Sequence, residues 1–147
     1  MAQTLTNLLM HVVFSTKNRE PMISADLKPS LLAYIGGIIR ELDGKLLAAD
    51  GTSDHVHLLM RLPPKLSLAD GLRVIKTNSS RWVRETHKQF RWQTGYAAFS
   101  VSESSVPEVA RYIRKQEQHH RRISFQEELR ACLKKHRIEY DERYIWE

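Results

Sequence analysis

The alternation of apolar and polar positions predicts a strand and then a helix in the first third of the chain. Residues 7–16 mix β-branched and large apolar side chains over about one strand length, and a polar stretch followed by Pro21 ends the run. Over residues 27–42, apolar side chains recur every three or four positions behind Ser24, a residue type that caps helices. We therefore expect a strand and then a helix that ends near the Asp-Gly pair at 43–44.

The middle of the chain predicts a hairpin and a second helix. Residues 45–49 and 55–62 have the composition of strands, the turn-rich segment 50–53 joins them, and a Pro-Pro pair closes the second strand. Ser67 and Asp70 form an arrangement like a capping box ahead of a helix that is apolar on one side. The basic residues on the other side of this helix are Arg73, Lys76, Arg81 and Arg84.

The last third of the chain predicts one more strand and two helices. Residues 96–102 have strand composition, and the stretch 104–108, which contains two serines, a proline and a glutamate, marks the start of a helix that holds Tyr112. A second capping box, Ser124 with Glu127, opens the last helix. We expect the apolar end of the tail to pack back on the domain.

This order of elements, β-α-β-β-α-β followed by two helices, indicates an α+β fold with a ferredoxin-like, RRM-like antiparallel sheet. In such a sheet strand four returns beside strand one. The first two helices cover one face, and the other face is free to carry a site or to receive an added helix. The additional C-terminal helices then carry Tyr112. Because 147 residues is the usual size of one domain, we expect residues 1–147 to form a single domain.

The charge balance of the chain favours an anionic partner. Lys and Arg number 23 against 17 Asp and Glu, which gives a net charge of +6 and a pI of about 9.6. Nucleic acid is the leading candidate, with solubility alone as the alternative. Cys132 is the one cysteine and has no disulfide partner, which fits a reducing cytoplasm. The apolar run 8–14 is short and interrupted by His11, so we expect neither a signal peptide nor a membrane helix.

Two histidines one residue apart are the first candidate for chemistry. Because strand side chains alternate, His55 and His57 point to the same face, where both rings can reach one metal ion. The alternative is a pair of ordinary polar surface residues. Their place within an otherwise apolar strand favours partners that offset the desolvation of the two rings.

A phenol, an amide and an imidazole line up on the third predicted helix. Tyr112 and Gln116 are one helical turn apart, and His119 follows on the same face. Tyr112 taken alone is more typical of an ordinary core residue of an amphipathic helix, and His120, nearer the apolar side, is expected to pack. Together with the basic side of the second helix, the basic residues here suggest one groove for a phosphate backbone, with a solvated face as the alternative. They are Arg111, Arg114, Lys115, Arg121 and Arg122.

With these residues in place, the chain resembles the single-tyrosine HUH transposases of the smallest insertion sequences, including relatives of the REP-associated tyrosine transposases. HUH stands for histidine, a hydrophobic residue and histidine. The segments that carry the resemblance follow the family's order over most of the chain. They are HVVFSTKNR at 11–19, DHVHLL at 54–59, WQTGYAAFSVS at 92–102, YIRKQEQHH at 112–120 and SFQEEL at 124–129.

The resemblance implies a catalytic set of four residues. His55, His57 and Gln116 would bind Mg²⁺ or Mn²⁺, and Tyr112 would be the nucleophile. The implied enzyme cleaves and rejoins single-stranded DNA at the ends of an insertion sequence through a 5′-phosphotyrosine intermediate, without ATP. Neutral ligands leave the full double charge of the metal available to the scissile phosphate.

The resemblance also implies how the chain meets its partners. Its substrates would be DNA hairpins near the ends of the element, and the protein would act as a homodimer. The basic residues of the second and third predicted helices are the candidates for DNA binding. Asp54 and His119 are candidates for an outer layer around the metal or for alternative ligands. Lys115 stands where similar sequences often have asparagine, a departure that leaves the catalytic set intact.

Two other functions stay open at this point. A non-catalytic nucleic-acid-binding module, such as a domesticated transposase that has kept only binding, has the same order of elements. Modules of that kind usually place stacking aromatics where this strand has His55 and His57. A metal-dependent phosphodiesterase would use water in place of Tyr112, and a covalent protein–DNA adduct distinguishes it from a transposase.

Overall fold

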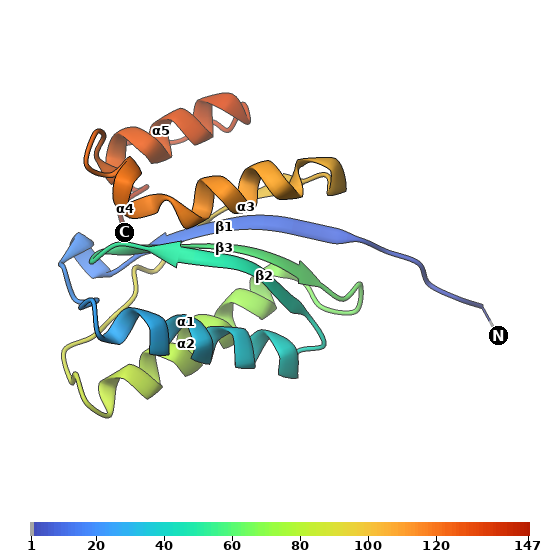
Figure 1. The fold of residues 1–147 in the computed structure, drawn as a ribbon, viewed down its shortest axis with the longest axis horizontal. Helices are drawn as coiled ribbons and strands as arrows, with labels where there is room; N and C mark the ends of the chain where they lie inside the picture. Colours follow the sequence, from blue (N-terminus) through green and yellow to red (C-terminus); the bar gives the residue numbers. More distant parts are fainter. Residues whose placement is uncertain (1) are drawn as a thin grey trace.

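Three layers stack in this protein, with a four-stranded sheet between two layers of helices (Figure 1). The computed structural model describes residues 2–147. The strands are β1 Leu8–Ser15, β2 Lys45–Gly51, β3 His55–Leu62 and β4 Ala97–Val101. The helices are α1 Leu27–Glu41, α2 Leu68–Arg84, α3 Val106–Arg114, α4 Gln116–His119 and α5 Phe125–Lys135, with short 3-10 turns η1 Lys17–Arg19 and η2 Glu103–Ser105.

The sheet has the strand order β2-β3-β1-β4, and every neighbouring pair is antiparallel. Strand four therefore lies beside strand one, and the predicted ferredoxin-like fold class is confirmed. The pairing places Ser15 opposite His55 and Val13 opposite His57. Because β3 is flanked by β1 and β2, both histidines lie in the interior of the sheet.

The two faces of β3 carry different chemistry. Val56, Leu58 and Met60 point into the main apolar core, which packs under α1 and α2. The residues between them, among which are His55 and His57, point to the other face. The strand thus contributes one apolar face to stability and one polar face to the site.

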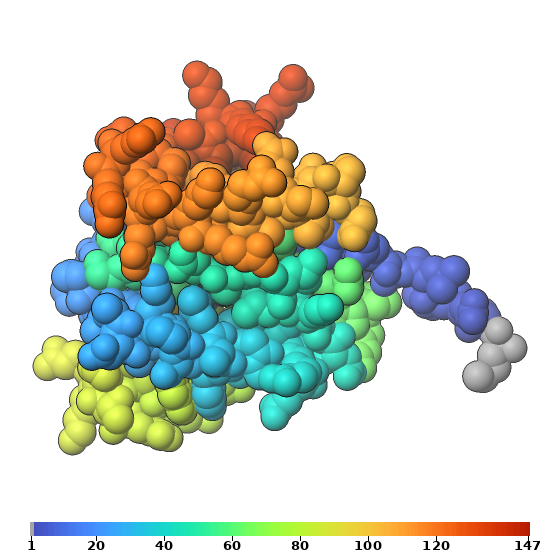
Figure 2. All heavy atoms as spheres, in the orientation of Figure 1, coloured from blue at the N-terminus to red at the C-terminus, as the bar shows by residue number. Residues whose placement is uncertain are grey.

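Added helices close the second face of the sheet. Phe125, Leu129 and Leu133 of α5 pack with Val13 and Phe99 from the sheet. In the space-filling view the orange residues of α3 and α4 lie on the sheet and the red residues of α5 appear above and behind them, while residues 2–7, in blue, extend away from the body (Figure 2). The polar face of β3 is therefore buried beneath protein.

Helices α2 and α5 begin directly after their predicted capping residues, and Ser24 accepts a hydrogen bond from the backbone N–H of Leu27, the first residue of α1, across Asp26. The Ser67 side chain accepts a hydrogen bond from the backbone N–H of Asp70 at the start of α2, and Ser124 accepts one from Glu127 at the start of α5. The longest helix, α2, has 17 residues. Among residues 2–147, no helix combines the length and the apolar character that crossing a bilayer requires.

Element boundaries differ from the sequence prediction at two places near the site. Strand β2 runs to Gly51, two residues beyond the predicted end, because 50–51 pair with residues 56–57 of β3. The predicted continuous helix through Tyr112 and His119 is interrupted at Lys115, whose φ of −105° and ψ of 22° are not helical. This break separates α3 from α4 and turns the chain where Gln116 enters the core.

Gly51 allows the tight approach of the hairpin that carries the histidines. A Cβ at this position would lie 2.2 Å from the backbone oxygen of His55. We expect Gly51→Ala to lower the free energy of unfolding by about 1–3 kcal/mol, because the backbone of β3 must shift to accept the methyl group. Gly37→Ala is the matched control: its nearest contact is 3.9 Å away, so a gain of about 0.5–1 kcal/mol is expected in the α1 interior. Denaturant unfolding measures both, and equal stabilities would contradict the prediction.

Candidate active site

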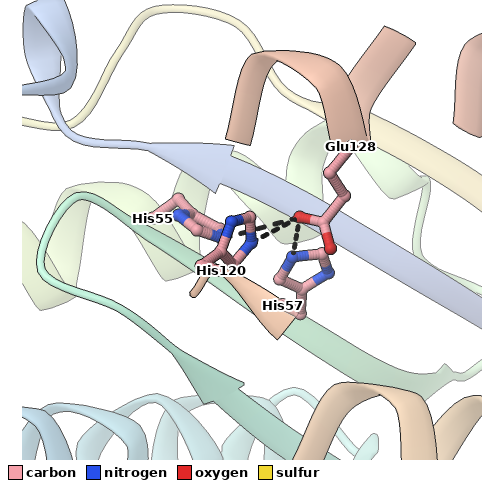
Figure 3. A group of neighbouring side chains, drawn as sticks. All are labelled: His55, His57, His120 and Glu128. Carbon is pink, nitrogen blue, oxygen red and sulfur yellow. Dashed lines mark hydrogen bonds and ion pairs between the residues drawn. The ribbon is translucent and has the colours of Figure 1, made fainter. Parts of the chain in front are cut away.

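Strand β3 supplies two buried imidazoles to the space beneath the added helices. His55 and His57 are fully buried, and their ring centroids lie 5.2 Å apart (Figure 3). Both come from the same face of the strand, as the alternation of strand side chains requires. The two Nε2 atoms point toward one centre, where side chains from the C-terminal helices meet them.

The break at Lys115 brings the two predicted helix residues to the same centre. Gln116, the first residue of α4, is fully buried, and its Oε1 lies 3.4 Å from Nε2 of His55. Tyr112, one turn earlier on α3, has its ring centroid 6.0 Å from that of His57. The structure therefore brings together His55, His57, Tyr112 and Gln116 within a single chain.

Glu128 of α5 lies at the middle of this group and was not predicted. Its Oε1 lies 2.9 Å from Nε2 of His57 and 3.6 Å from Nε2 of His55 (Figure 3). Its other oxygen, Oε2, accepts hydrogen bonds from the Tyr112 hydroxyl and, at 3.3 Å, from the Gln116 amide. The carboxylate thus connects the phenol to the imidazoles.

His120 also belongs to the cluster, so the expectation that it only packs is wrong. Its Nε2 lies 3.0 Å from Oε1 of Glu128 and 3.0 Å from Oε1 of Gln116, and its Nδ1 lies 3.0 Å from the backbone oxygen of Ile123. Because α4 starts after a break, its residues are rotated relative to a continuous helix. This rotation turns the ring of His120 toward His55, at 4.6 Å between centroids.

An outer layer of side chains orients the imidazoles. Nδ1 of His55 lies 2.8 Å from the carboxylate of Asp54 and 3.0 Å from the hydroxyl of Thr52. Nδ1 of His57 lies 2.8 Å from Nε2 of His11, a buried residue of β1. Such contacts fix the ring orientation and leave each Nε2 facing the centre.

His119 lies beside the phenol and is partly exposed. Its Nε2 is 3.3 Å from the Tyr112 hydroxyl and 3.1 Å from Oε2 of Glu128. Asp54 and His119, both predicted as outer-layer residues, therefore contact opposite ends of the site. Asp54 touches an imidazole, and His119 touches the phenol.

Burial and charge set the protonation states of the site. Burial, reinforced by the nearby His57, lowers the pKa of His11 to about 3, and burial likewise lowers the pKa of His57. Burial raises the pKa of Tyr112 well above its ordinary value, and the adjacent Glu128 carboxylate adds to this shift. At neutral pH the two histidines are therefore neutral, and the tyrosine holds its proton.

The carboxylate of Glu128 stays ionised at this depth. Burial by itself favours the neutral acid, but hydrogen bonds from His120 and His57 outweigh it and hold the pKa of Glu128 well below its ordinary range. For His120, burial disfavours the charged ring, but the hydrogen bond to Glu128 outweighs this cost and raises the pKa. The site therefore contains a buried negative charge that attracts a cation.

The arrangement fits a divalent metal ion. One possible ligand atom from each of His55, His57, His120 and Glu128 lies within 4.8 Å of all the others. Atoms that share one ion at bond lengths of about 2.0–2.2 Å must lie about 3–4 Å apart. Imidazole nitrogens and carboxylate oxygens are common ligands of divalent metals. The amide oxygen of Gln116 is one more possible ligand atom at this site.

Two hollows open on either side of Tyr112. One has a volume of about 540 Å³, lies between β4, α3 and α5, and reaches Glu128 and His119. The other has a volume of about 500 Å³ and is lined by three basic residues, Lys115, Arg121 and Arg122. A phosphate backbone that approached the phenol would therefore meet positive charge.

The other predicted basic residues do not join this surface. Lys115 lines the hollow beside Tyr112, whereas Arg111 and Arg114 are exposed on α3 and do not line it. Helix α2 lies on the opposite face of the sheet, so the expectation of one continuous basic groove is wrong. A separate hollow of about 420 Å³ is lined there by Arg73, Lys76, Arg84 and Arg91, and Arg81 is exposed outside it.

Lys76 is held in place within this second hollow. Its ammonium group donates to the backbone oxygens of Gln93, Thr94 and Gly95. Burial lowers the pKa of Lys76 to about 8. The side chain therefore anchors the loop before β4 as well as adding charge.

Sequence reasoning missed Glu128 and His11, although each left a signal. On α5, Phe125 and Leu129 form an apolar stripe in which Glu128 is the polar exception. His11 interrupts the apolar run of β1 in the same way. A polar residue within an apolar stripe predicts a buried partner, but only the fold shows that the partner is His57 in both cases.

Comparisons with known proteins find related sequences. The sequence model of the family "Transposase IS200 like" matches residues 4–116. The transposase of the insertion sequence IS200 from Salmonella typhimurium is 26% identical over 128 residues, which cover 79% of this chain and 81% of the relative.

Two solved structures have a similar fold. A transposase-like chain from Deinococcus radiodurans R1 has a TM-score of 0.65 at 22% identity, with 79% of this chain and 95% of that chain covered. A REP-associated tyrosine transposase bound to a REP hairpin has a TM-score of 0.61 at 15% identity, with 82% and 74% covered. At these identities the two likenesses establish the fold.

Proposed function

Because the chain belongs to the family of IS200-like transposases, we propose that it cleaves and rejoins single-stranded DNA with Tyr112 as the nucleophile. One observation carries this proposal. The Tyr112 hydroxyl lies against a carboxylate and an imidazole, in a cluster of metal-ligand groups built from one chain. A purely structural tyrosine has no need of such neighbours.

The contacts of Tyr112 define its part in strand cleavage. Its hydroxyl oxygen forms a bond to the phosphorus, and its proton passes to one of two acceptors already in contact, Glu128 or His119. The bond from phosphorus to the 3′ oxygen breaks, and that oxygen leaves as a 3′ hydroxyl after taking up a proton. The DNA is then joined to the protein through a 5′-phosphotyrosine.

The phosphotyrosine bond retains the energy of the original phosphodiester. A 3′ hydroxyl that attacks it forms a new DNA linkage and returns the proton to the tyrosine, so rejoining consumes no nucleotide triphosphate. The contacts that position the Tyr112 hydroxyl before cleavage are the same contacts that it makes again after rejoining. Glu128 and His119 serve both directions.

We propose that His55, His57 and Gln116 bind the metal. The position of their ligand atoms around one centre supports this proposal. A bound Mg²⁺ or Mn²⁺ would supply positive charge to the scissile phosphate and so stabilise the charge that develops during transfer. Burial lowers the pKa of His57 and so keeps its ring neutral, while the contacts of both Nδ1 atoms orient the two imidazoles and the surrounding protein excludes water from the inner side of the site.

We propose DNA hairpins as substrates, with a homodimer as the form that processes two element ends. The hairpin in the structure of the REP-associated relative supports the first point, together with the two basic hollows of this chain. Within one chain, Tyr112 and Gln116 already lie beside the two histidines of β3, so we propose that each subunit of the dimer holds its own cleavage site. Light scattering with and without hairpin DNA tests the second point.

The decisive experiment captures the covalent intermediate. A labelled oligonucleotide that carries the hairpin and flank of the element is incubated with the protein and Mg²⁺ or Mn²⁺. We expect a protein–DNA species that survives denaturant and disappears when the metal is chelated. Binding without any adduct would instead assign the chain to the non-catalytic class.

Hairpin binding should depend on the arginines of α2. We expect Arg73→Gln with Arg84→Gln to weaken binding and to reduce the slope of log K against log salt by about 1–2, since each phosphate contact contributes about 0.9. Arg143→Gln is the matched control, because that side chain pairs with Asp141 in the tail. Fluorescence anisotropy across a salt series measures the slopes, and equal slopes for the two variants would refute this surface.

His11 should act on the metal through His57. We expect His11→Phe to preserve the buried volume but to lower Mn²⁺ affinity about 10–100-fold, because Nδ1 of His57 loses its hydrogen-bond partner. The control is His87→Phe, whose exposed ring lies just after α2, on the other side of the sheet from the imidazole pair. Calorimetric titration with Mn²⁺ compares the two variants, and equal affinities would exclude the positioning role.

A further inference from the structure

We propose that Glu128 and His120 are themselves metal ligands, so that α5 and the end of α4 complete within one chain the site that β3 begins. This inference rests on the proposed function and assigns two ligands beyond His55, His57 and Gln116. It makes the site a nitrogen-rich one with a single carboxylate. The expected ion is a divalent transition metal such as Mn²⁺ in preference to Mg²⁺, which favours oxygen ligands.

The separations between the ligand atoms support a common ion. Oε1 of Glu128 lies 2.9 Å from Nε2 of His57, 3.0 Å from Nε2 of His120 and 3.6 Å from Nε2 of His55. Atoms bound to one ion at about 2.0–2.2 Å lie about 3–4 Å apart. The three distances to Oε1 of Glu128 agree with this range, and one ligand atom from each of the four residues lies within 4.8 Å of the others (Figure 3).

The hydrogen bonds behind the rings decide which nitrogen faces the centre. Nδ1 of His120 contacts the backbone oxygen of Ile123, which only accepts, and Nδ1 of His55 contacts the carboxylate of Asp54. Each Nδ1 must therefore carry the hydrogen, which leaves the lone pair of each neutral ring on Nε2. This is the tautomer that binds metals through Nε2.

These lone pairs face other acceptors. Nε2 of His120 points at carboxylate and amide oxygens 3.0 Å away, and Nε2 of His55 lies 3.4 Å from the Gln116 oxygen. Acceptors that face one another repel unless a hydrogen or a metal cation lies between them. Without a metal, the hydrogen that Nε2 of His120 donates to Glu128 takes this place, and a bound metal would replace it. A metal ion at the centre satisfies the whole group at once, and the buried carboxylate offsets part of its charge.

The second oxygen of Glu128 gives the carboxylate a further task. Oε2 accepts the hydrogen of the Tyr112 hydroxyl, while Oε1 faces the metal position. One side chain thus fixes the distance between the nucleophile and the ion. Tyr112 is placed beside the phosphate that the ion would hold, without any rearrangement of α3.

Metal binding to the DNA-free protein tests the assignment. We expect calorimetric titration with Mn²⁺ to give an affinity at least about tenfold lower for Glu128→Gln and for His120→Phe than for the wild type. Glu127→Gln, which removes the same charge from the exposed neighbour on α5, should bind as the wild type does. Pulsed electron paramagnetic resonance of bound Mn²⁺ should show one fewer imidazole nitrogen coupling in His120→Phe.

Parallel assays separate this inference from the proposed function. Circular dichroism and thermal melts verify folding, and His120→Phe carries the test if Glu128→Gln does not fold. An adduct formed by the wild type, together with unchanged Mn²⁺ affinity and unchanged nitrogen couplings in the variants, would overturn the ligand assignment alone. Faster cleavage by Glu128→Gln with unchanged Mn²⁺ affinity would also overturn the ligand assignment. The carboxylate would then occupy the position of the substrate phosphate and would not bind the metal.

Discussion

Replacing Tyr112 with phenylalanine should abolish the covalent protein–DNA adduct and strand cleavage together. The substitution removes the hydroxyl that contacts both Glu128 and His119, while the aromatic ring keeps its place on α3. Binding of hairpin DNA should change little, because the basic hollow beside the ring remains. Denaturing electrophoresis of the labelled reaction measures the adduct and the cleaved strand in the same lane.

A matched tyrosine gives the control for this result. Tyr140 is 42% exposed and lies after α5, so Tyr140→Phe should form the adduct at the wild-type rate. Cleavage by Tyr112→Phe at the wild-type rate, without an adduct, would show that water is the nucleophile and that the chain is a phosphodiesterase. This result would refute Tyr112 as the nucleophile and would leave the metal assignment unaffected.

Replacing His57 with alanine should remove metal binding and cleavage in one step. His57 is fully buried, contacts Glu128 on one nitrogen and His11 on the other, and so connects two layers of the site. A metal that contributes several kcal/mol to the transition state corresponds to a loss of at least about 10³-fold in rate. Calorimetric titration with Mn²⁺ and single-turnover cleavage measure the two effects.

The control for this variant is a histidine far from the centre. His87 is exposed at the end of α2, and His87→Ala should leave both measurements unchanged. A His57→Ala protein that folds, as judged by its thermal melt, and still binds Mn²⁺ with wild-type affinity would contradict the metal assignment. Loss of Mn²⁺ affinity in His57→Ala with cleavage at the wild-type rate would show that cleavage does not depend on this metal.

The order of the elements could be predicted from local pattern, and the place of strand four beside strand one followed from that order. Apolar residues with a period of two or of about 3.6 identify strands and helices, and serine caps fix the starts of α2 and α5. The break at Lys115 could not be predicted in this way. It depends on tertiary packing, because Gln116 turns inward to meet His55 across 61 positions of sequence.

The candidate site was only partly visible in the sequence. His55 with His57, and Tyr112 with Gln116, are close neighbours along one element, so strand and helix periodicity group them. Glu128 meets His57 across 71 positions, and His11 meets it across 46. Contacts of this range depend on how α5 and β1 lie on the sheet, which no local pattern encodes.

The pairing of His57 with Val13 makes the function depend on the parity of the strand register. If β3 slipped by one residue against β1, the two imidazoles would turn into the apolar core and Val56 and Leu58 would face Tyr112. A slip by two would restore the face but move each ring by about 7 Å, beyond reach of its partners. An insertion or deletion that changes the register of β1 and β3 therefore removes the site completely. Selection for DNA cleavage thus also maintains this one register.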